Sequence, residues 1–138
     1  SVSRGLGDVY KRQKYEGGEM TVKLDFHIDQ GTDCRCPLCF LDDYSELDLT
    51  GCTARMEVRP SASSERVVDL LTTENGRITI RGSSLTVYWP HAVTEALPEG
   101  AWVYDLELVT SGGEVTRVLC GRLIVSKEVT RWPYPETA

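Results

Sequence analysis

Three cysteines fall within six positions in the segment DCRCPLC, residues 33–39, and a fourth follows at position 52. A structural zinc site needs about four thiolate or imidazole ligands that converge on one ion. Cys34, Cys36, Cys39 and Cys52 would supply that number. In an extended strand, however, Cys34 and Cys36 point to one face and Cys39 to the other, so convergence would require a break at Pro37.

The same cysteines also fit the interior of a folded domain. Unpaired cysteine behaves as a small hydrophobic residue and is among the most buried residue types. Cys34, Cys36, Cys52 and Cys120 stand at positions where the pattern calls for apolar side chains. We therefore expect core packing, with zinc binding or a redox role as the alternatives, and we predict no cofactor.

Two further groups of residues could carry acid–base chemistry. His27 is flanked by Asp25 and Asp29 on one strand face, which could hold a metal or a general base with its orienting carboxylate. Asp105 and Glu107 share the polar face of VYDLEL, and paired carboxylates suit glycoside hydrolysis. A solvated strand face and a cross-strand charge pair are the commoner explanations.

Composition and motifs favour a protein without catalysis. The chain has two histidines and lacks the G-x-S-x-G, P-loop, G-x-G-x-x-G and H-E-x-x-H patterns. Its net charge of −6 argues against nucleic-acid binding. No apolar run approaches the ~20 residues of a membrane helix. We therefore expect neither an enzyme, nor a nucleic-acid binder, nor a membrane protein.

Most of the chain alternates between apolar and polar residues, as half-buried strands do. The segments with this pattern are residues 22–29, 34–40, 52–59, 66–72, 76–82, 83–90, 101–110 and 115–126. They predict an antiparallel β-sandwich of about seven or eight strands, with one short helical turn near residues 91–97. The turn SGGE joins the last two segments, and Gly121 suggests a bulge that points Leu123 and Val125 inward.

The two ends of the chain differ from this pattern. Residues 1–13 resemble a translated sequencing adapter found at the ends of unrelated metagenome-derived sequences. We therefore expect residues 1–19 to be a non-native or disordered leader, residues 20–126 to form the sandwich and residues 127–138 to form an extended arm.

Several blocks of sequence resemble a known family. DLTGCTARMEVR, LLTTENGRITI and YDLELVTSGGEVTRVLCGRLIVSKEVTR are similar to a family of small structural proteins of tailed phages, related in pattern to the N-terminal domain of baseplate upper proteins. The resemblance covers roughly residues 20–131. The family usually has other residues at the four cysteine positions, which favours core packing for them.

The resemblance implies an immunoglobulin-like sandwich that serves as a virion component, a tail or baseplate adaptor or anchor assembled in the cytoplasm of the bacterial host. Its partners would be other virion proteins or further copies of itself. Trp132 and Tyr134 in the arm are the candidate partner-binding residues, because aromatic anchors dominate protein interfaces. An exposed sheet edge offers a second route, by strand addition.

Two functions of other classes remain open. A carbohydrate-binding sandwich would use Trp89 or Trp102, although both fit inward positions. A small zinc-stabilised protein would use Cys34, Cys36, Cys39 and Cys52, and chelators would unfold it.

Overall fold

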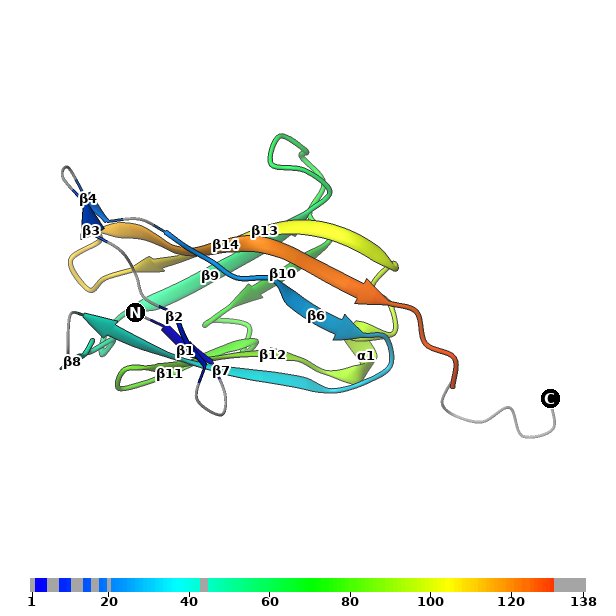
Figure 1. The fold of residues 1–138 in the computed structure, drawn as a ribbon, viewed down its shortest axis with the longest axis horizontal. Coiled ribbons are helices and arrows are strands. Elements are labelled where there is room, and N and C mark those ends of the chain that lie inside the picture. Colours follow the sequence, from blue (N-terminus) through cyan, green and yellow to red (C-terminus); the bar gives the residue numbers. More distant parts are fainter. Residues whose placement is uncertain are drawn as a thin grey trace.

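The computed structural model describes residues 2–4, 8–10, 14–15, 18–19, 21–42 and 45–130 of the 138-residue chain. Two layers of β-strands face each other across an apolar interior (Figure 1). The sandwich predicted from the alternating pattern is confirmed.

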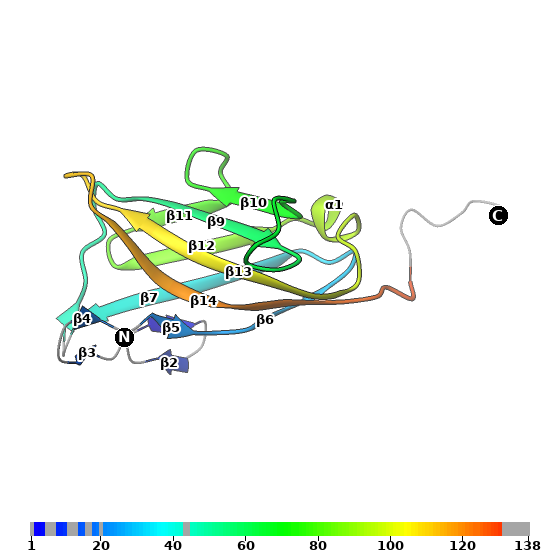
Figure 2. The same ribbon diagram turned by 90° about the horizontal axis from the view of Figure 1, so that it is seen from above.

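One layer, the β13 sheet, contains the hairpin nearest the C-terminus. Its spatial order is β10 (Asp69–Thr72), β9 (Thr53–Arg59), β13 (Gly100–Val109), β14 (Val115–Ser126) and then β5 (Val22–Lys23), followed along the same edge by β6 (Phe26–Asp29). Neighbours from β10 to β14 are antiparallel, whereas β5 and β6 run parallel to β14. Figure 2 shows β9, β13 and β14 side by side.

The other layer, the β7 sheet, lies beneath. It holds β11 (Ile78–Arg81), β12 (Ser84–Trp89) and β7 (Cys34–Asp42), with β8 (Ser45–Glu46) folded back on the end of β7. β1 (Val2–Arg4) pairs with β7 at Leu38–Phe40, and β2 (Asp8–Tyr10) pairs with β1. β3 (Lys14–Tyr15) and β4 (Gly18–Glu19) pair with each other. That residues 1–19 form a leader stays a prediction.

The strand order is that of an immunoglobulin-like sandwich. β7, β12 and β11 take the places of strands B, E and D, and β9, β13 and β14 those of C, F and G. β10 extends the second sheet beside β9. The first strand, split into β5 and β6, lies beside β14 rather than β7.

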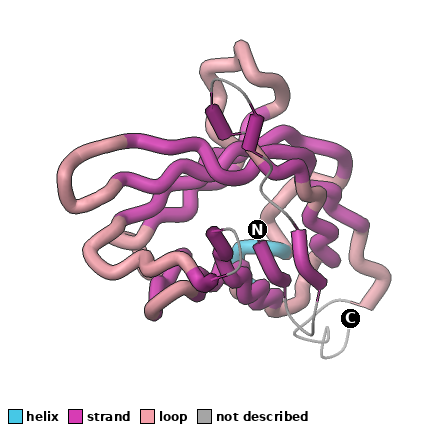
Figure 3. Tube along the Cα trace, turned by 60° about the vertical axis from the view of Figure 1, so that its left-hand side comes forward, coloured by secondary structure: helices cyan, strands magenta, loops and turns pink. Residues whose placement is uncertain are grey.

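The predicted helical turn is confirmed as α1 (His91–Thr94), which joins β12 to β13. It is the single helix of the described residues (Figure 3). The turn continues through a backbone hydrogen bond from Leu97 to Val93. The buried Thr94 hydroxyl donates to the carbonyl of Thr32 at 2.8 Å, which holds α1 against the start of β7.

The core is built from the inward residues of both sheets, as their period of two requires. The buried ring of Phe26 joins the layers, because its centroid lies 5.3 Å from that of Trp89 in one sheet and 5.1 Å from that of Tyr104 in the other. The largest fully buried side chains are Trp89, Phe40, Ile28, Leu38, Leu49, Met56, Leu71, Ile78, Leu85, Leu106, Leu119 and Leu123.

The first strand is interrupted between β5 and β6, and side chains replace the missing ladder bonds there. The Tyr104 hydroxyl donates to the carbonyl of Leu24, and the Asp25 carboxylate accepts the backbone N–H of Arg122 at 2.9 Å. Gly121 permits this approach, because a Cβ on it would lie 2.2 Å from the carbonyl oxygen of Leu24. Close backbone approach is one of the recurrent uses of glycine in a strand.

The predicted bulge at Gly121 is wrong in its position. The register between β13 and β14 shifts at Val118 instead, while Leu123 and Val125 point inward as expected. Gly121 does mark an unusual position in β14, but the reason is that the backbone of the first strand passes close to it at Leu24.

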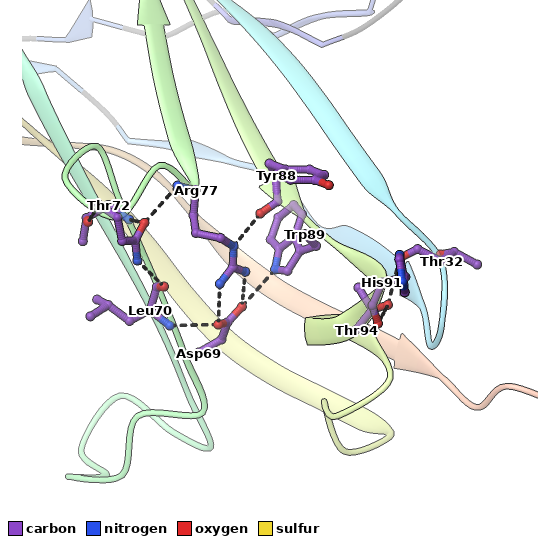
Figure 4. Close-up of polar contacts among 10 residues, drawn as sticks. Thr32, Asp69, Leu70, Thr72, Arg77, Tyr88, Trp89, His91 and Thr94 are labelled. Carbon is purple, nitrogen blue, oxygen red and sulfur yellow. Dashed lines mark hydrogen bonds and ion pairs between the residues drawn. The ribbon is translucent and has the colours of Figure 1, made fainter. Parts of the chain in front are cut away.

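A polar network ties the two sheets together on the side of β10 and β11 (Figure 4). The Arg77 guanidinium binds both carboxylate oxygens of Asp69, at 3.2 and 2.9 Å, and also donates to the carbonyl of Tyr88. The Trp89 indole N–H and the backbone N–H of Leu70 donate to the same carboxylate. Four donor contacts therefore converge on one buried acid.

Candidate functional site

The four cysteines of the zinc hypothesis do not converge in the structure. β7 continues unbroken through Pro37, so Cys34 and Cys36 face the core with Leu38 while Cys39 lies on the outer face. The Cys39 thiol is 3.6 Å from the Ser83 hydroxyl. Cys52 packs against the core. Among the described residues, no three side chains of His, Cys, Asp or Glu gather closely enough to hold a metal ion.

Cys120 departs from the core placement predicted for it. It is opposite Asp105 on the outer face of the β13 sheet, because the shift at Val118 reverses the facing of the residues that follow. The prediction was wrong here, since it placed the shift at Gly121, three residues after its actual position at Val118.

The histidines are engaged in surface contacts or lie exposed. His27 is exposed on the outer side of β6, and Asp25 beside it binds Arg122 rather than the imidazole. His91 donates its backbone N–H to Asp33 at 2.6 Å, with its ring Nδ1 3.1 Å from the same oxygen. These bonds hold the pKa of Asp33 below its ordinary value. The arrangement fastens the start of α1 to the turn that precedes β7.

The outer side of the β13 sheet forms a surface that we call the charged face. Its side chains stand in three rows across β9, β13 and β14, set by the strand registers. From the α1 end, the rows are Arg59, Val103 and Arg122; then Glu57, Asp105 and Cys120; then Arg55, Glu107 and Arg117. Asp105 and Glu107, considered as a hydrolytic pair, therefore belong to a cross-strand ladder of charges.

Ion pairs between neighbouring rows neutralise the central carboxylates. Glu57 accepts hydrogen bonds from both Arg59 and Arg55, which together hold its pKa below the ordinary value. Asp105 pairs with Arg117 at 3.3 Å. Like charges directly opposite each other destabilise a sheet, so the arginines make the Glu57–Asp105 juxtaposition tolerable.

A groove of about 790 Å³ runs over this face. Its floor consists of the outward residues of β9, β13 and β14, and its wall is the loop between β9 and β10, including residues 62–65. Arg59 fixes the loop by donating to the carbonyl of Ser64. Figure 1 shows this loop standing out from the sandwich. The volume is in the range of ligand pockets, and the lining carries both signs of charge.

The tryptophans proposed for carbohydrate binding are differently placed. Trp89 is 0% exposed and belongs to the core. Trp102 is half-buried: its indole N–H donates to the carbonyl of Pro98 at 3.0 Å, and the Arg66 guanidinium lies 5.9 Å from its ring centroid. Neither ring forms an open platform for a sugar.

The sheet edges are modified in ways that hinder strand addition. At β10 the side chain of Asn75 accepts the N–H of Thr72 and donates to the carbonyl of Leu70. At β7 the N–H of Phe40 points toward β12, so by alternation the backbone of Pro37 faces the opposite side of β7, just beyond the stretch Leu38–Phe40 where β1 pairs, and proline has no N–H to offer there. Such devices commonly protect edge strands.

The arm begins where β14 ends. The backbone N–H of Glu128 donates to the side chain of Gln30 at 3.0 Å, and Val129, the next residue, is 94% exposed. Figures 1 and 2 show the chain continuing away from the sheets beyond Ser126. Trp132 and Tyr134 lie outside the described residues, so their role stays a prediction.

No protein-family model matches this chain, and no curated protein matches it in sequence. No helix in the described part of the chain has the length and apolar character to cross a membrane. The charged face and its groove are the candidate functional site, because the groove brings charged side chains of three strands together on one surface. The groove was not predictable from the sequence, because it depends on how the loop of residues 60–65 folds over three strands that are distant in sequence.

Proposed function

We propose that this chain is a non-enzymatic structural protein of a tailed-phage virion, acting through protein–protein interfaces as a tail or baseplate adaptor. The observation that carries the proposal is the charged face with its groove. Interfaces between proteins that assemble reversibly are rich in arginine and hydrated polar contacts. A face with four arginines, walled by a protruding loop, suits that use better than a reaction.

The residues that suggested chemistry support the same proposal. Asp105 is neutralised by Arg117, His91 is bound to Asp33, and Cys34 and Cys36 pack toward the core. These groups stabilise the sandwich or order its surface. The domain would therefore bind a partner through the shape and charge of its surface. The strand order agrees with the fold that the family resemblance implies.

Proteomics of purified phage particles would test the virion assignment. Particles produced from a genome that encodes this chain should contain it at a fixed ratio to the other tail proteins. Its recovery only in the lysate, with none in gradient-purified particles, would refute the assignment. Glycan binding by the purified chain at micromolar concentration, or one equivalent of zinc after buffer exchange, would favour the other two classes.

A further inference from the structure

The outer edge of β7 takes a strand from outside the sandwich. β12 and β8 both lie on the other side of β7, because the N–H of Phe40 donates to Ser83 and its carbonyl accepts the N–H of Leu47. The first strand of the sandwich pairs with β14 and leaves the outer edge of β7 uncovered. In the described part of the chain, only β1 pairs along this edge, at Leu38–Phe40. The sandwich itself therefore leaves the edge open.

The pairing of β1 defines the position and length of this seat. β1 has the sequence VSR and runs antiparallel to β7, with Ser3 opposite Cys39. By alternation from Phe40, the backbone N–H and carbonyl of Cys39 point to the outer edge, so Ser3 and Cys39 form a hydrogen-bonded pair. Pro37, two residues away, has no N–H to offer. The seat is therefore short and centred on Cys39.

The arm carries the same pattern of residues as β1. Residues 129–131 read VTR, compared with VSR in β1. Val129 is 94% exposed, so the folded domain covers almost none of this apolar side chain, although β-branched residues favour strands. In the register of β1, the arm would place Thr130 opposite Cys39. The arm therefore contains a candidate strand for the seat that β1 occupies.

The arm cannot take this seat in its own copy. Ser126, where β14 ends, is bonded to Gln30 in the turn that leads into β7. Val129 is three residues further along, at most ~11 Å away. Its partner in the seat, Phe40, is six residues into β7 from Cys34, or ~20 Å from that turn. The arm also leaves the sandwich opposite to the direction in which β7 runs (Figure 2). An arm in this seat therefore comes from a second copy.

We propose that residues 129–131 of one copy add a strand to the outer edge of β7 in a second copy, with Thr130 opposite Cys39. Main-chain hydrogen bonds supply the affinity in such strand addition. Pro133 of the arm and Pro37 of the acceptor both end the pairing beyond this segment. The contact is head-to-tail, so repetition gives a ring if it closes and a filament if it does not. The inference rests on the proposed function, since it names one contact between copies in the assembly.

Sedimentation velocity of full-chain variants would test the contact, because β1 and the arm compete for one seat. Ser3→Pro removes the N–H that β1 directs at Cys39, so this variant should associate at least about tenfold more tightly than the unmodified chain. Adding Thr130→Pro should reverse that gain. Adding Lys127→Pro instead is the matched control, because the N–H of residue 127 faces away from β7 in the proposed register and its loss should leave association unchanged.

A disulfide trap would check the register. The probe is a peptide of residues 126–135 with Thr130→Cys, activated as its mixed disulfide with thionitrobenzoate, and the acceptor is the full chain with Ser3→Pro and Thr130→Pro. In a hydrogen-bonded antiparallel pair the Cα atoms are ~5.5 Å apart, which a disulfide spans. The half-buried Cys39 thiol should therefore attack the peptide sulfur and release thionitrobenzoate. Peptide mapping locates the new bond.

Two changes should each lower the yield of this product at least about tenfold. One is Cys39→Ser in the acceptor. The other moves the peptide cysteine to position 129, whose side chain points to the opposite face of the strand. The unmodified chain, in which β1 competes, should form the same product more slowly, so the trap does not depend on the folding of the Ser3→Pro variant.

Association of Ser3→Pro that Thr130→Pro leaves unchanged, or a trap that links Cys39 no faster than Cys52 or Cys120, would overturn the inference. Particle proteomics separates this failure from that of the proposed function. If the chain is present in purified particles and these two results are negative, only the strand addition fails. If the chain is absent from the particles, the proposed function fails irrespective of how copies associate in solution.

Discussion

Replacing Asp69 by leucine should be among the most destabilising single changes in this domain. The side chains of Asp69 and Arg77 are only 8% and 15% exposed, so the substitution leaves a guanidinium largely shielded from water and without its counter-ion. Removing one partner of a buried pair typically costs 3–5 kcal/mol, and the indole N–H of Trp89 loses its acceptor as well. We expect a loss of about 4 kcal/mol, or a Tm lower by about 12 °C.

Urea unfolding followed by tryptophan fluorescence would measure this loss, because Trp89 reports on the network directly. The matched variant is Arg77→Met, alone and combined with Asp69→Leu. The double variant removes both charges and leaves only neutral donors and the Tyr88 carbonyl unsatisfied, so it should lose about 2 kcal/mol, well below the sum of the single losses.

Two outcomes would refute this reasoning. A loss below about 1 kcal/mol for Asp69→Leu would mean that the guanidinium finds water or another acceptor at little cost. If the double variant loses as much free energy of unfolding as the two single variants together, the two side chains do not act as a pair in the folded protein.

Two further predictions concern the β13 sheet. Gly121→Ala should lower the free energy of unfolding by about 2 kcal/mol in the same urea assay, because the new methyl group meets the carbonyl of Leu24. The control is Gly112→Ala, which adds the same methyl group where its nearest neighbour is the Thr110 hydroxyl at 3.8 Å, and equal losses for the two variants would contradict the steric explanation. The pKa of Glu57 is lower in the folded chain than its ordinary value of 4.5, so its ionised form contributes stability above that pH and loses it as the pH falls through the folded value. Glu57→Gln should therefore lower the urea midpoint at neutral pH, and the difference from the wild type should shrink as the pH falls below 4.5 and through the folded pKa of Glu57. A difference independent of pH would exclude this linkage.

Much of the sandwich was predictable from the sequence because each strand buries one face. The alternation in residues 53–59 and 101–110 placed Met56, Val58, Leu106 and Leu108 inward, as found. The hairpin turn SGGE was also predictable, since Gly113 adopts the positive φ of 88° that such turns require.

Pairing partners were not predictable in the same way. A period of two fixes which residues face the core but not which strand lies alongside, so the parallel contact of the first strand with β14 had no local signal. The position of the register shift at Val118 was not predictable either. Several residues around Val118 are apolar, so the sequence pattern fits both possible registers of β14.

The candidate site depended on such long-range pairing. Arg55, Glu107 and Arg117 come from three strands. They form one row only because of the register between β9 and β13 and the register between β13 and β14. Asp105 and Glu107 stand out in the sequence as a pair along one strand, whereas the residues that neighbour them in the sheet come from β9 and β14. The ion pair of Asp69 with Arg77 was also missed, since neither residue interrupts its local pattern.

The parallel contact between the first and last strands has a mechanical consequence. Tension applied to the two ends of the sandwich pulls β6 toward its start and β14 toward its end, so the strands are loaded in shear. The bonds from Leu24 to Cys120 and from Gln30 to Ser126 lie at opposite ends of their shared ladder and bear that tension together. An antiparallel hairpin pulled from its open end would instead unzip one bond at a time. A copy tethered through both ends should thus unfold only when the whole ladder slides at once, and its lifetime under tension is set by that single barrier.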